Sequence, residues 1–406
     1  MDVGDTLKRE VRALWADGTG LALGAVATTW GLLIGTRMIL PVVLPSIQET
    51  FDLSLTVAGL LVTILWLGGA IGQLPGGMLA DKYDERTLMA TSAVVVGVAL
   101  VAFVFAPSAV VLFGAAAVWG LAHSLYPIAR ITLLSNLYPD RLGSALGVTM
   151  ATGDVGQTAL PPLGAVLAGA IAWQAGLGFV IPLLVAFGVL ILMFVPKTSS
   201  PDDDNGSGRS LEGVRAVVPA LSTPSMGFIT LILFLYIFIW QSFTAFYPTY
   251  LITVKGIQPA IASALFGLFF AVGVVVKPIA GGAYDRIGIR GSLVGVLAAP
   301  VGGFFLLPFV DELWALALIT ALVSTMLGSG AITQSYLAES FPEELRGTGL
   351  GVVRTVTATV GAGGPLVFGA IGDYGYFDEG YWALAAIMAV IVLLTLAMPT
   401  TSAARN

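Results

Sequence analysis

The sequence alternates between long apolar runs and short polar turns, and this alternation constrains the fold more than any other feature. A helix that crosses a bilayer needs about 20 mostly apolar residues, and twelve runs are long enough. Charged residues make up only 10% of the chain, too few to cover a soluble domain. We therefore expect a polytopic all-α membrane protein with twelve transmembrane helices. The expected spans are 20–47, 55–79, 87–106, 109–137, 143–172, 176–195, 221–252, 258–281, 291–309, 312–340, 347–371 and 380–398.

The twelve runs fall into two sets of six that share one internal offset. The segment "PKTSSPDDDNGSGRSLEGVR", 196–215, is polar and rich in Gly and Ser, which is typical of a flexible linker. We expect an N-terminal six-helix bundle over 1–195, a linker over 196–220 and a C-terminal bundle over 221–406. Landmarks 204 residues apart indicate a duplicated unit, and such a chain is typical of a secondary transporter. The landmark pairs are Asp81 and Asp285, Gly147 and Gly351, and Pro161 and Pro365.

The positive charges predict the orientation. With both termini and the linker on one side, that side holds thirteen Lys and Arg residues and the other holds only Lys255. Lys and Arg are enriched in cytoplasmic loops. We therefore expect both termini in the cytoplasm and the protein in the cytoplasmic membrane.

Two charged, glycine-rich turns on the expected cytoplasmic side carry a family resemblance. "GGMLADKYDER", 76–86, and "GGAYDRIGIR", 281–290, resemble the signature Gly-x-x-x-Asp-(Arg/Lys)-x-Gly-x-(Arg/Lys) of the major facilitator superfamily. In the first copy, Asp84 replaces the later glycine. The matching residues are Gly77, Asp81, Lys82 and Arg86 in the first copy, and Gly281, Asp285, Arg286, Gly288 and Arg290 in the second.

The resemblance implies alternating access, in which the two halves rock around a central site. It also implies that the charged turns form a cytoplasmic gate that stabilises the outward-open state. Glu339 is the expected acidic partner of the second copy. The alternative is that these turns only set the topology.

Ionisable residues within the spans are costly to insert, at about 2.5 kcal/mol or more each, so they are candidate functional residues. Four are basic, Arg37, Arg130, Lys277 and Arg354, and Asp154 is the one clearly intramembrane acid. The resulting positive balance favours an anionic substrate.

Arg37 lies near the middle of the first expected span. A guanidinium can bind a carboxylate or phosphate in bidentate fashion. The stretch "RMILPVVLP", 37–45, resembles the first helix of organic-anion members of the superfamily, where an arginine binds the substrate. The alternative role is a structural pairing inside the bundle.

In the fourth span, Arg130, Tyr126 and His123 share one helix face, at spacings that are typical of a stripe lining a cavity. Arg130 is a candidate for substrate binding or for an internal pair with Asp154. Asp154 and His123 are candidates for proton coupling, because burial can raise the pKa of a carboxylate toward neutrality and an imidazole titrates near neutrality by itself. Gln334 is the repeat counterpart of Arg130 and a further candidate lining residue.

Lys277 and Arg354 lie on the eighth and eleventh spans, where oxalate/formate-type members of the superfamily place basic substrate ligands. The alternative is that their side chains reach the cytoplasmic surface. The seventh span is aromatic, with Trp240 and Gln241 as candidate substrate contacts. We expect Tyr247 and Tyr250 to lie in an interfacial aromatic belt.

The leading hypothesis is a proton-linked or exchange transporter of a small organic anion, with a carboxylate as the first choice. The alternatives are a proton-coupled multidrug efflux transporter and a non-transporting sensor on the same scaffold. With no cysteine and a single histidine, we expect no metal site, no other cofactor and no enzymatic activity. The expected partners are the substrate, a coupling H⁺ and the lipid bilayer. We expect no binding of nucleic acid, and we expect a monomer.

Overall fold

The computed structural model describes all residues except 1–13, 15–17, 81, 198–222, 342–345 and 399–406, and the described part is helical without strands. This confirms the all-α fold class. Most of the expected linker, 196–220, lies outside the described residues. The chain divides into two compact units, and each is described here by itself. The first contains 1–53, 61–204 and 257–267, and the second contains 54–60, 205–256 and 268–406.

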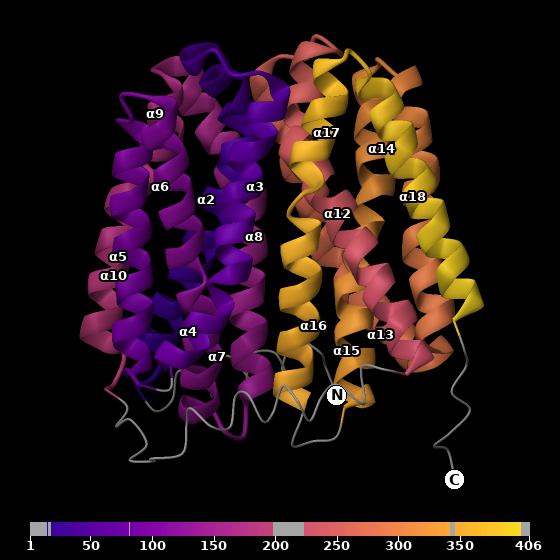
Figure 1. Cartoon of the computed structure of the whole chain (residues 1–406). Coiled ribbons are helices and arrows are strands. Elements are labelled where there is room, and N and C mark those ends of the chain that lie inside the picture. The colour runs from indigo at the N-terminus through magenta and orange to yellow at the C-terminus, as the bar shows by residue number, and fades with distance from the viewer. Residues whose placement is uncertain (1–13, 15–17, 81, 198–222, 342–345, 399–406) are drawn as a thin grey trace. The chain divides into compact units, whose positions relative to one another are not determined.

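The helices follow the apolar runs closely (Figure 1). In the N-terminal half they are α2 (Gly20–Phe51), α3 (Leu55–Ile71), α4 (Gln73–Ala80), α5 (Glu85–Val104), α6 (Ala109–His123), α7 (Leu125–Leu137), α8 (Leu142–Ala170), α9 (Trp173–Gly178) and α10 (Val180–Phe194). In the C-terminal half they are α12 (Pro224–Thr253), α13 (Pro259–Leu306), α14 (Leu313–Ser324), α15 (Ser329–Ser340), α16 (Arg346–Gly361), α17 (Gly364–Asp373) and α18 (Phe377–Ala397), with short 3₁₀ turns at Leu307–Phe309 and Thr325–Gly328.

Nine helices of the described chain are long and apolar enough to cross a membrane. One of them, Pro259–Phe309, covers two expected spans, 258–281 and 291–309, because the helices join at Gly288. The expected span 55–79 appears as α3 and α4, although backbone hydrogen bonds continue across the break at Gly72. The expected span 143–172 is α8, whose glycines, threonines and Asp154 make it more polar than the nine. The count of twelve spans therefore stays a prediction.

Small residues bring α2 and α8 into close contact in the first unit. A Cβ atom on Gly35 would lie 2.5 Å from the carbonyl oxygen of Gly156, and one on Gly156 would lie 2.1 Å from that of Gly31. Small residues that allow backbones to approach are the usual basis of helix packing in membranes. This contact fixes α2, the helix that carries Arg37, against the unit.

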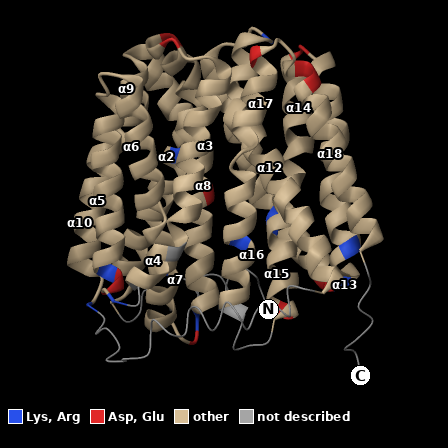
Figure 2. Cartoon of the chain, in the orientation of Figure 1, with Lys and Arg blue, Asp and Glu red and all other residues tan. Residues whose placement is uncertain are grey.

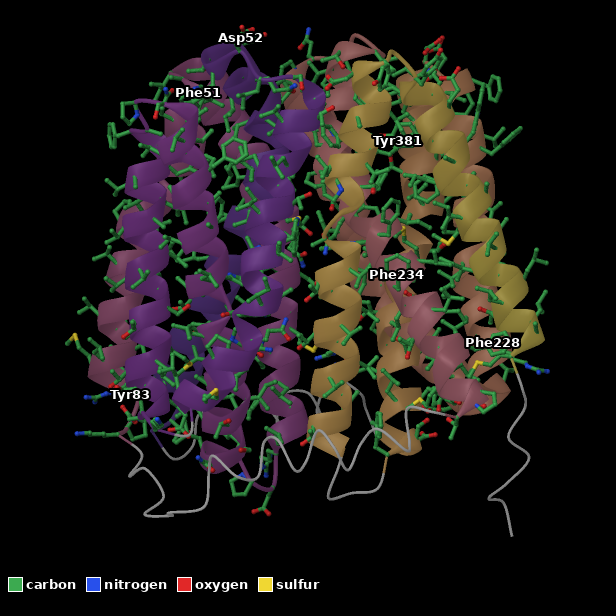
Figure 3. The ribbon with its side chains drawn as sticks, in the orientation of Figure 1. Phe51, Asp52, Tyr83, Phe228, Phe234 and Tyr381 are labelled. Atoms are coloured by element: carbon green, nitrogen blue, oxygen red, sulfur yellow. The ribbon has the colours of Figure 1, made fainter. Side chains whose placement is uncertain are left out.

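The polar ends of the first unit are visible in the figures. Charged residues gather near the helix ends in Figure 2. Figure 3 labels Asp52 at the C-terminal end of α2 and Tyr83 in the first charged turn, at opposite ends of this unit. Asp52 adopts a left-handed conformation with φ 52° and ends the helix.

The aromatic residues of α12 form the core of the second unit. The Phe243 ring packs against those of Tyr247, Phe269 and Phe304 at centroid distances of 4.5, 5.0 and 5.4 Å. Tyr247 bonds to the hydroxyl of Thr320.

Two of the three tyrosines of α12, the pair predicted for an interfacial aromatic belt, are buried inside the second unit. Tyr247 and Tyr250 are 1% and 0% exposed. Tyr250 donates to a carboxylate oxygen of Asp378 at 2.6 Å. Because each buried hydroxyl finds a protein partner, neither tyrosine needs the headgroup region.

The two charged turns reverse the chain in different ways. Gly288 has φ 70° and ψ −178°, a conformation that is essentially restricted to glycine. Asp84 stands at the equivalent place with φ −54°, and its carboxylate accepts hydrogen bonds from the amide and hydroxyl of Thr87 at 3.2 and 3.0 Å. Asp84, the residue by which the first copy departs from the signature, is therefore the N-cap of α5.

We expect Gly288→Ala to destabilise the protein by about 1–3 kcal/mol, because a side chain is strained in this conformation. The measurement is the apparent melting temperature of the purified protein in detergent. Gly282→Ala is the matched control, since Gly282 is helical and a Cβ there meets no atom within 4 Å. Equal melting temperatures for the two variants would contradict the assignment.

Candidate functional site

Two arginines are buried in the first unit, one on α2 and one on α7. Arg37 is 8% exposed and Arg130 is 6% exposed. Arg37 lies 14 residues before Phe51, or about 21 Å along the helix. Its guanidinium is therefore far from either end of α2.

The guanidinium of Arg37 lies over an indole of α3. Its Cζ is 3.8 Å from the ring centroid of Trp66, a cation–π contact of about 2 kcal/mol in a desolvated setting. Gly69, one helix turn further, leaves room for the group, because a Cβ there would lie 3.2 Å from Nη2. Nε and Nη2 of Arg37 are buried and have no hydrogen-bond partner among the described residues.

Arg130 has a similar arrangement on α7. Its Cζ lies 4.1 Å from the ring centroid of Trp30 on α2. Nη1 donates to the hydroxyl of Thr149 at 2.8 Å, while the buried Nε has no hydrogen-bond partner in the described part of the chain. Trp30 itself fits against α8 at Gly153, where a Cβ would lie 2.9 Å from the indole Nε1.

Trp30 also brings together the other members of the predicted stripe. The ring of His123 stacks on it at 6.0 Å with an interplanar angle of 30°, and that of Tyr126 at 6.1 Å and 15°. The hydroxyl of Tyr126 donates to the carbonyl oxygen of Val26 at 2.8 Å. The expected single helix is broken at Ser124, between α6 and α7, yet the three residues still converge on this indole.

The aromatic and glycine neighbours of the arginines are the residues that sequence reasoning missed. Trp30 lies seven residues before Arg37, so both fall on one face of α2, and that spacing could have signalled it. Trp66, Gly69 and Gly153 carry no such signal, because they belong to other helices whose packing the sequence does not specify.

Asp154 lies on α8 and is partly exposed. Gln157, one turn further along, donates its Nε2 to a carboxylate oxygen of Asp154 at 3.3 Å. The Nη1 of Arg130, the predicted partner of Asp154, donates to the hydroxyl of Thr149.

The second unit contains the remaining predicted substrate contacts. Gln241 on α12 is 3% exposed, and its buried Oε1 has no hydrogen-bond partner among the described residues. Trp240 is partly buried, as is Lys277 on α13. Arg354 on α16 and Gln334 on α15 are exposed.

The gate residues lie at the expected turns. Asp81 lies outside the described residues, and Gly77 and Gly281 are within α4 and α13. Arg86 donates its Nη1 to the carbonyl oxygen of Val195 at 3.3 Å, and its Nε lies 4.0 Å from Asp84 Oδ2.

In the second copy, the hydroxyl of Tyr284 donates to a carboxylate oxygen of Glu339 at 2.8 Å. Lys82, Asp285 and Arg286 are exposed, while Arg290 is partly buried. The acid predicted for this gate therefore binds a tyrosine of the same turn.

The arrangement in the first unit is suited to binding an oxyanion. A guanidinium is planar, carries five N–H donors and cannot lose its charge readily. When an indole covers one face, the N–H edge stays available for an acceptor in the plane. In the described part of the chain no group of three or more His, Cys, Asp or Glu residues could hold a metal ion.

Comparison with known proteins identifies the family. The model of the Major Facilitator Superfamily matches residues 25–362. The chain belongs to this superfamily. Its members are secondary transporters, so the protein is a membrane transporter.

Two curated superfamily relatives cover most of the chain. The nitrite extrusion protein of Bacillus subtilis is 22% identical over 85% of this chain and 87% of its own length. The probable sulfoacetate transporter SauU of Cupriavidus necator is 23% identical over 93% of each chain. Among solved structures, the nucleoside transporter NupG has a TM-score of 0.79 at 13% identity, over 94% of this chain and 99% of its own. This last similarity supports the superfamily fold alone.

We expect Thr149→Val to destabilise this transporter by about 1–3 kcal/mol, because Nη1 of buried Arg130 loses its hydrogen-bond acceptor. The apparent melting temperature in detergent measures the effect. Thr152→Val on the same helix is the control, since its hydroxyl donates to the carbonyl oxygen of Val148, a bond within α8. If the two variants have equal melting temperatures, the hydrogen bond to Arg130 contributes nothing to the stability of the protein.

Proposed function

We propose that this protein transports a small organic anion, with a carboxylate as the leading class, and that Arg37 binds the anionic group. One observation supports the proposal most strongly. Arg37 is buried far from both ends of α2, yet Nε and Nη2 have no acceptor among the described residues. A buried donor without a partner costs about 1–3 kcal/mol, and more for a charged group. Binding an oxyanion would satisfy both nitrogens and neutralise the charge.

The contact with Trp66 favours a planar anionic group. The indole keeps the Arg37 guanidinium over its ring, 3.8 Å from the ring centroid, while Nε and Nη2 have no acceptor among the described residues. Such a fork matches the two oxygens of a carboxylate or the oxygens of a sulfonate. A cationic drug would be repelled by the same group.

Arg130 adds a second buried positive charge to the first unit, and its guanidinium lies on Trp30, the indole that also contacts His123 and Tyr126. Its Nε is also buried without an acceptor in the described chain. Two guanidinium groups in one unit support an anion more than a neutral substrate. Trp30, His123 and Tyr126 would then contact the organic part of the substrate.

The names of the relatives agree with this substrate class. One is called a nitrite extrusion protein and the other a probable sulfoacetate transporter, and both names refer to anions. With 22% and 23% of their residues identical to this chain, these relatives support an anion as the class of substrate. They do not say which anion it is.

The coupling and the contribution of the C-terminal half stay predictions. We propose proton-linked transport or anion exchange, with Asp154 and His123 as the coupling candidates. Lys277 and Arg354 are further candidate ligands for the anion, and Gln241, Trp240 and Gln334 are candidate polar and aromatic contacts.

A stabilisation screen and a flux assay separate the proposed function from its alternatives. Carboxylates, inorganic anions, phosphate esters and cationic drugs are compared for their effect on the melting temperature. Stabilisation by anions supports the proposal, whereas stabilisation by cationic drugs alone would support multidrug efflux. Binding without flux into proteoliposomes would indicate a sensor.

We expect Arg37→Gln to lower anion uptake into proteoliposomes by at least about 30-fold, because removing one partner of a buried hydrogen-bonded charge pair costs about 2–5 kcal/mol. Lys197→Gln is the matched control, since it removes one positive charge from an exposed position at the end of α10. The melting temperature of each variant confirms folding. Unchanged uptake by folded Arg37→Gln would refute the role of Arg37.

We expect Lys277→Gln and Arg354→Gln each to reduce uptake about tenfold, because a hydrogen bond to a charged group contributes about 1.5–3 kcal/mol. Uptake kinetics of each variant test this. Arg286→Ala is unsuitable as a comparison because it lies in the gate motif, so Lys197→Gln serves again. If both variants transport at the wild-type rate, these two residues act only at the membrane surface.

A further inference from the structure

The N-terminus of α3 is capped by a side chain from a distant part of the chain. Asp373, the last residue of α17, accepts hydrogen bonds from the backbone amides of Leu55 and Thr56 at 2.6 and 2.8 Å, and it also accepts one from the Thr56 hydroxyl. The next amide, that of Val57, donates to the hydroxyl of Ser54 at 3.3 Å. The first amides of a helix have no acceptor within the helix. Two of these three amides therefore depend on Asp373.

The position of Asp373 on its own helix gives no local reason for an acid. A negative charge is unfavourable beside the C-terminus of a helix and favourable beside an N-terminus, because of the helix dipole. Asp373 stands at the C-terminal end of α17 and at the N-terminal end of α3. Its carboxylate is therefore stabilised by α3 and not by α17.

The two helices meet through their backbones beside this cap. A Cβ on Gly59 would lie 2.3 Å from the carbonyl oxygen of Pro365, and one on Gly369 would lie 2.3 Å from that of Leu55. No side chain stands between the backbones at these two points. Asp373 itself is exposed, so water can replace the amide donors if they leave. The hydrogen bonds to Asp373 are thus the specific links of a contact that can open.

The helix that receives this cap is divided between the two compact units. Residues 54–60 belong to the second unit, whereas residues 61–71 of α3 belong to the first. In transporters built from repeats, alternating access is largely a rocking of one repeat against the other. A helix divided in this way must bend or give up contacts during such a motion. The contacts of its first turns with α17 are the ones that Asp373 secures.

The equivalent place in the other copy of the repeat lacks this cap. At the offset of 204 residues, Pro259 corresponds to Leu55 and Gly169 corresponds to Asp373. Pro259 begins α13 and has no amide hydrogen to satisfy, while Gly169 has no side chain to offer. The carboxylate is therefore a feature of one copy and not a requirement of the repeated fold.

We propose that Asp373 is a releasable latch for the start of α3. Its carboxylate holds this segment on α17 in the state described here, and the segment leaves α17 in another state of the transport cycle. The proposal goes beyond the proposed function and does not depend on the substrate. Loss of the carboxylate should favour the released state, in which water reaches the face of α3 that meets α17. Ala58 lies on that face, three residues after Leu55, and is 0% exposed.

The test measures how readily water-soluble reagents reach this face. The chain contains no cysteine, so Ala58→Cys introduces a single thiol at the contact. The full-length Ala58→Cys protein in detergent is treated with a charged thiol reagent, and the rate of modification reports how often α3 leaves α17. Adding Asp373→Asn should raise this rate about tenfold or more, because hydrogen bonds to a charged group are weakened.

Glu312→Gln is the matched control for the loss of charge. Glu312 is an exposed acid at the start of α14, and its side chain makes no capping hydrogen bond in the described chain. Adding this change to Ala58→Cys should leave the rate of modification unaltered. Adding Thr56→Val, which removes only the hydroxyl bond to Asp373, should raise the rate by less than Asp373→Asn does.

A local cap distinguishes a latch from a fixed helix cap. Ser54→Asp, combined with Asp373→Asn, places a carboxylate at the N-cap of α3 without linking α3 to α17. This combination should regain most of the melting temperature of the Ala58→Cys protein and still be modified fast. If Asp373→Asn alone unfolds the protein, the comparison is made with this combination.

Each other outcome would contradict the proposal. Equal rates with and without Asp373→Asn would show that the carboxylate does not hold the contact. A fast rate that Ser54→Asp returns to that of the Ala58→Cys protein would show that Asp373 is a fixed helix cap. An equal rise in Glu312→Gln would show an effect of charge at this end of the protein and no latch.

Discussion

The packing of the first unit depends on one constraint, the burial of guanidinium groups within an apolar helix bundle. A charge in the middle of a membrane helix is costly unless it is paired or covered. Here an indole of α3 covers one face of Arg37, and an indole of α2 covers one face of Arg130. A cation–π contact offsets part of the desolvation and leaves the N–H edge available. The contact that makes the buried charge tolerable therefore also leaves the donors that the proposed anion binding requires.

Glycines make this arrangement possible. Gly69 leaves room for the Arg37 guanidinium and Gly153 leaves room for the Trp30 indole, while Gly31, Gly35 and Gly156 bring α2 and α8 together. Side chains at these positions would displace either the backbone or the aromatic rings. In a membrane, where apolar burial does not drive helices together, such close contacts are a main source of packing energy. The packing of α2 on α8 and the room for the Arg37 and Trp30 side chains thus both depend on glycines of these helices and of α3.

Much of the fold could be predicted from the sequence because its physical cause is local. The length and spacing of the apolar runs predicted helices within a few residues of those observed, and the charged turn at 281–290 predicted a chain reversal that Gly288 provides. The candidate site was predicted in part. Four candidate residues could be recognised because a polar side chain is costly to bury in an apolar membrane helix. These are Arg37, Arg130, Tyr126 and His123. The role of Trp30 could be inferred only from its spacing to Arg37.

The sequence by itself determined the class of protein, the helices and the identity of the buried charges, since these follow from hydropathy, length and residue type along one segment. Only the tertiary structure decided what those charges contact. Trp66 contacts Arg37, and Trp30 contacts Arg130, His123 and Tyr126. Asp84 caps the N-terminus of α5. The tertiary structure also buried Tyr247 and Tyr250, which their sequence context suggested for the membrane interface. Partners on other helices depend on how the helices rotate and pack, and no local pattern encodes that.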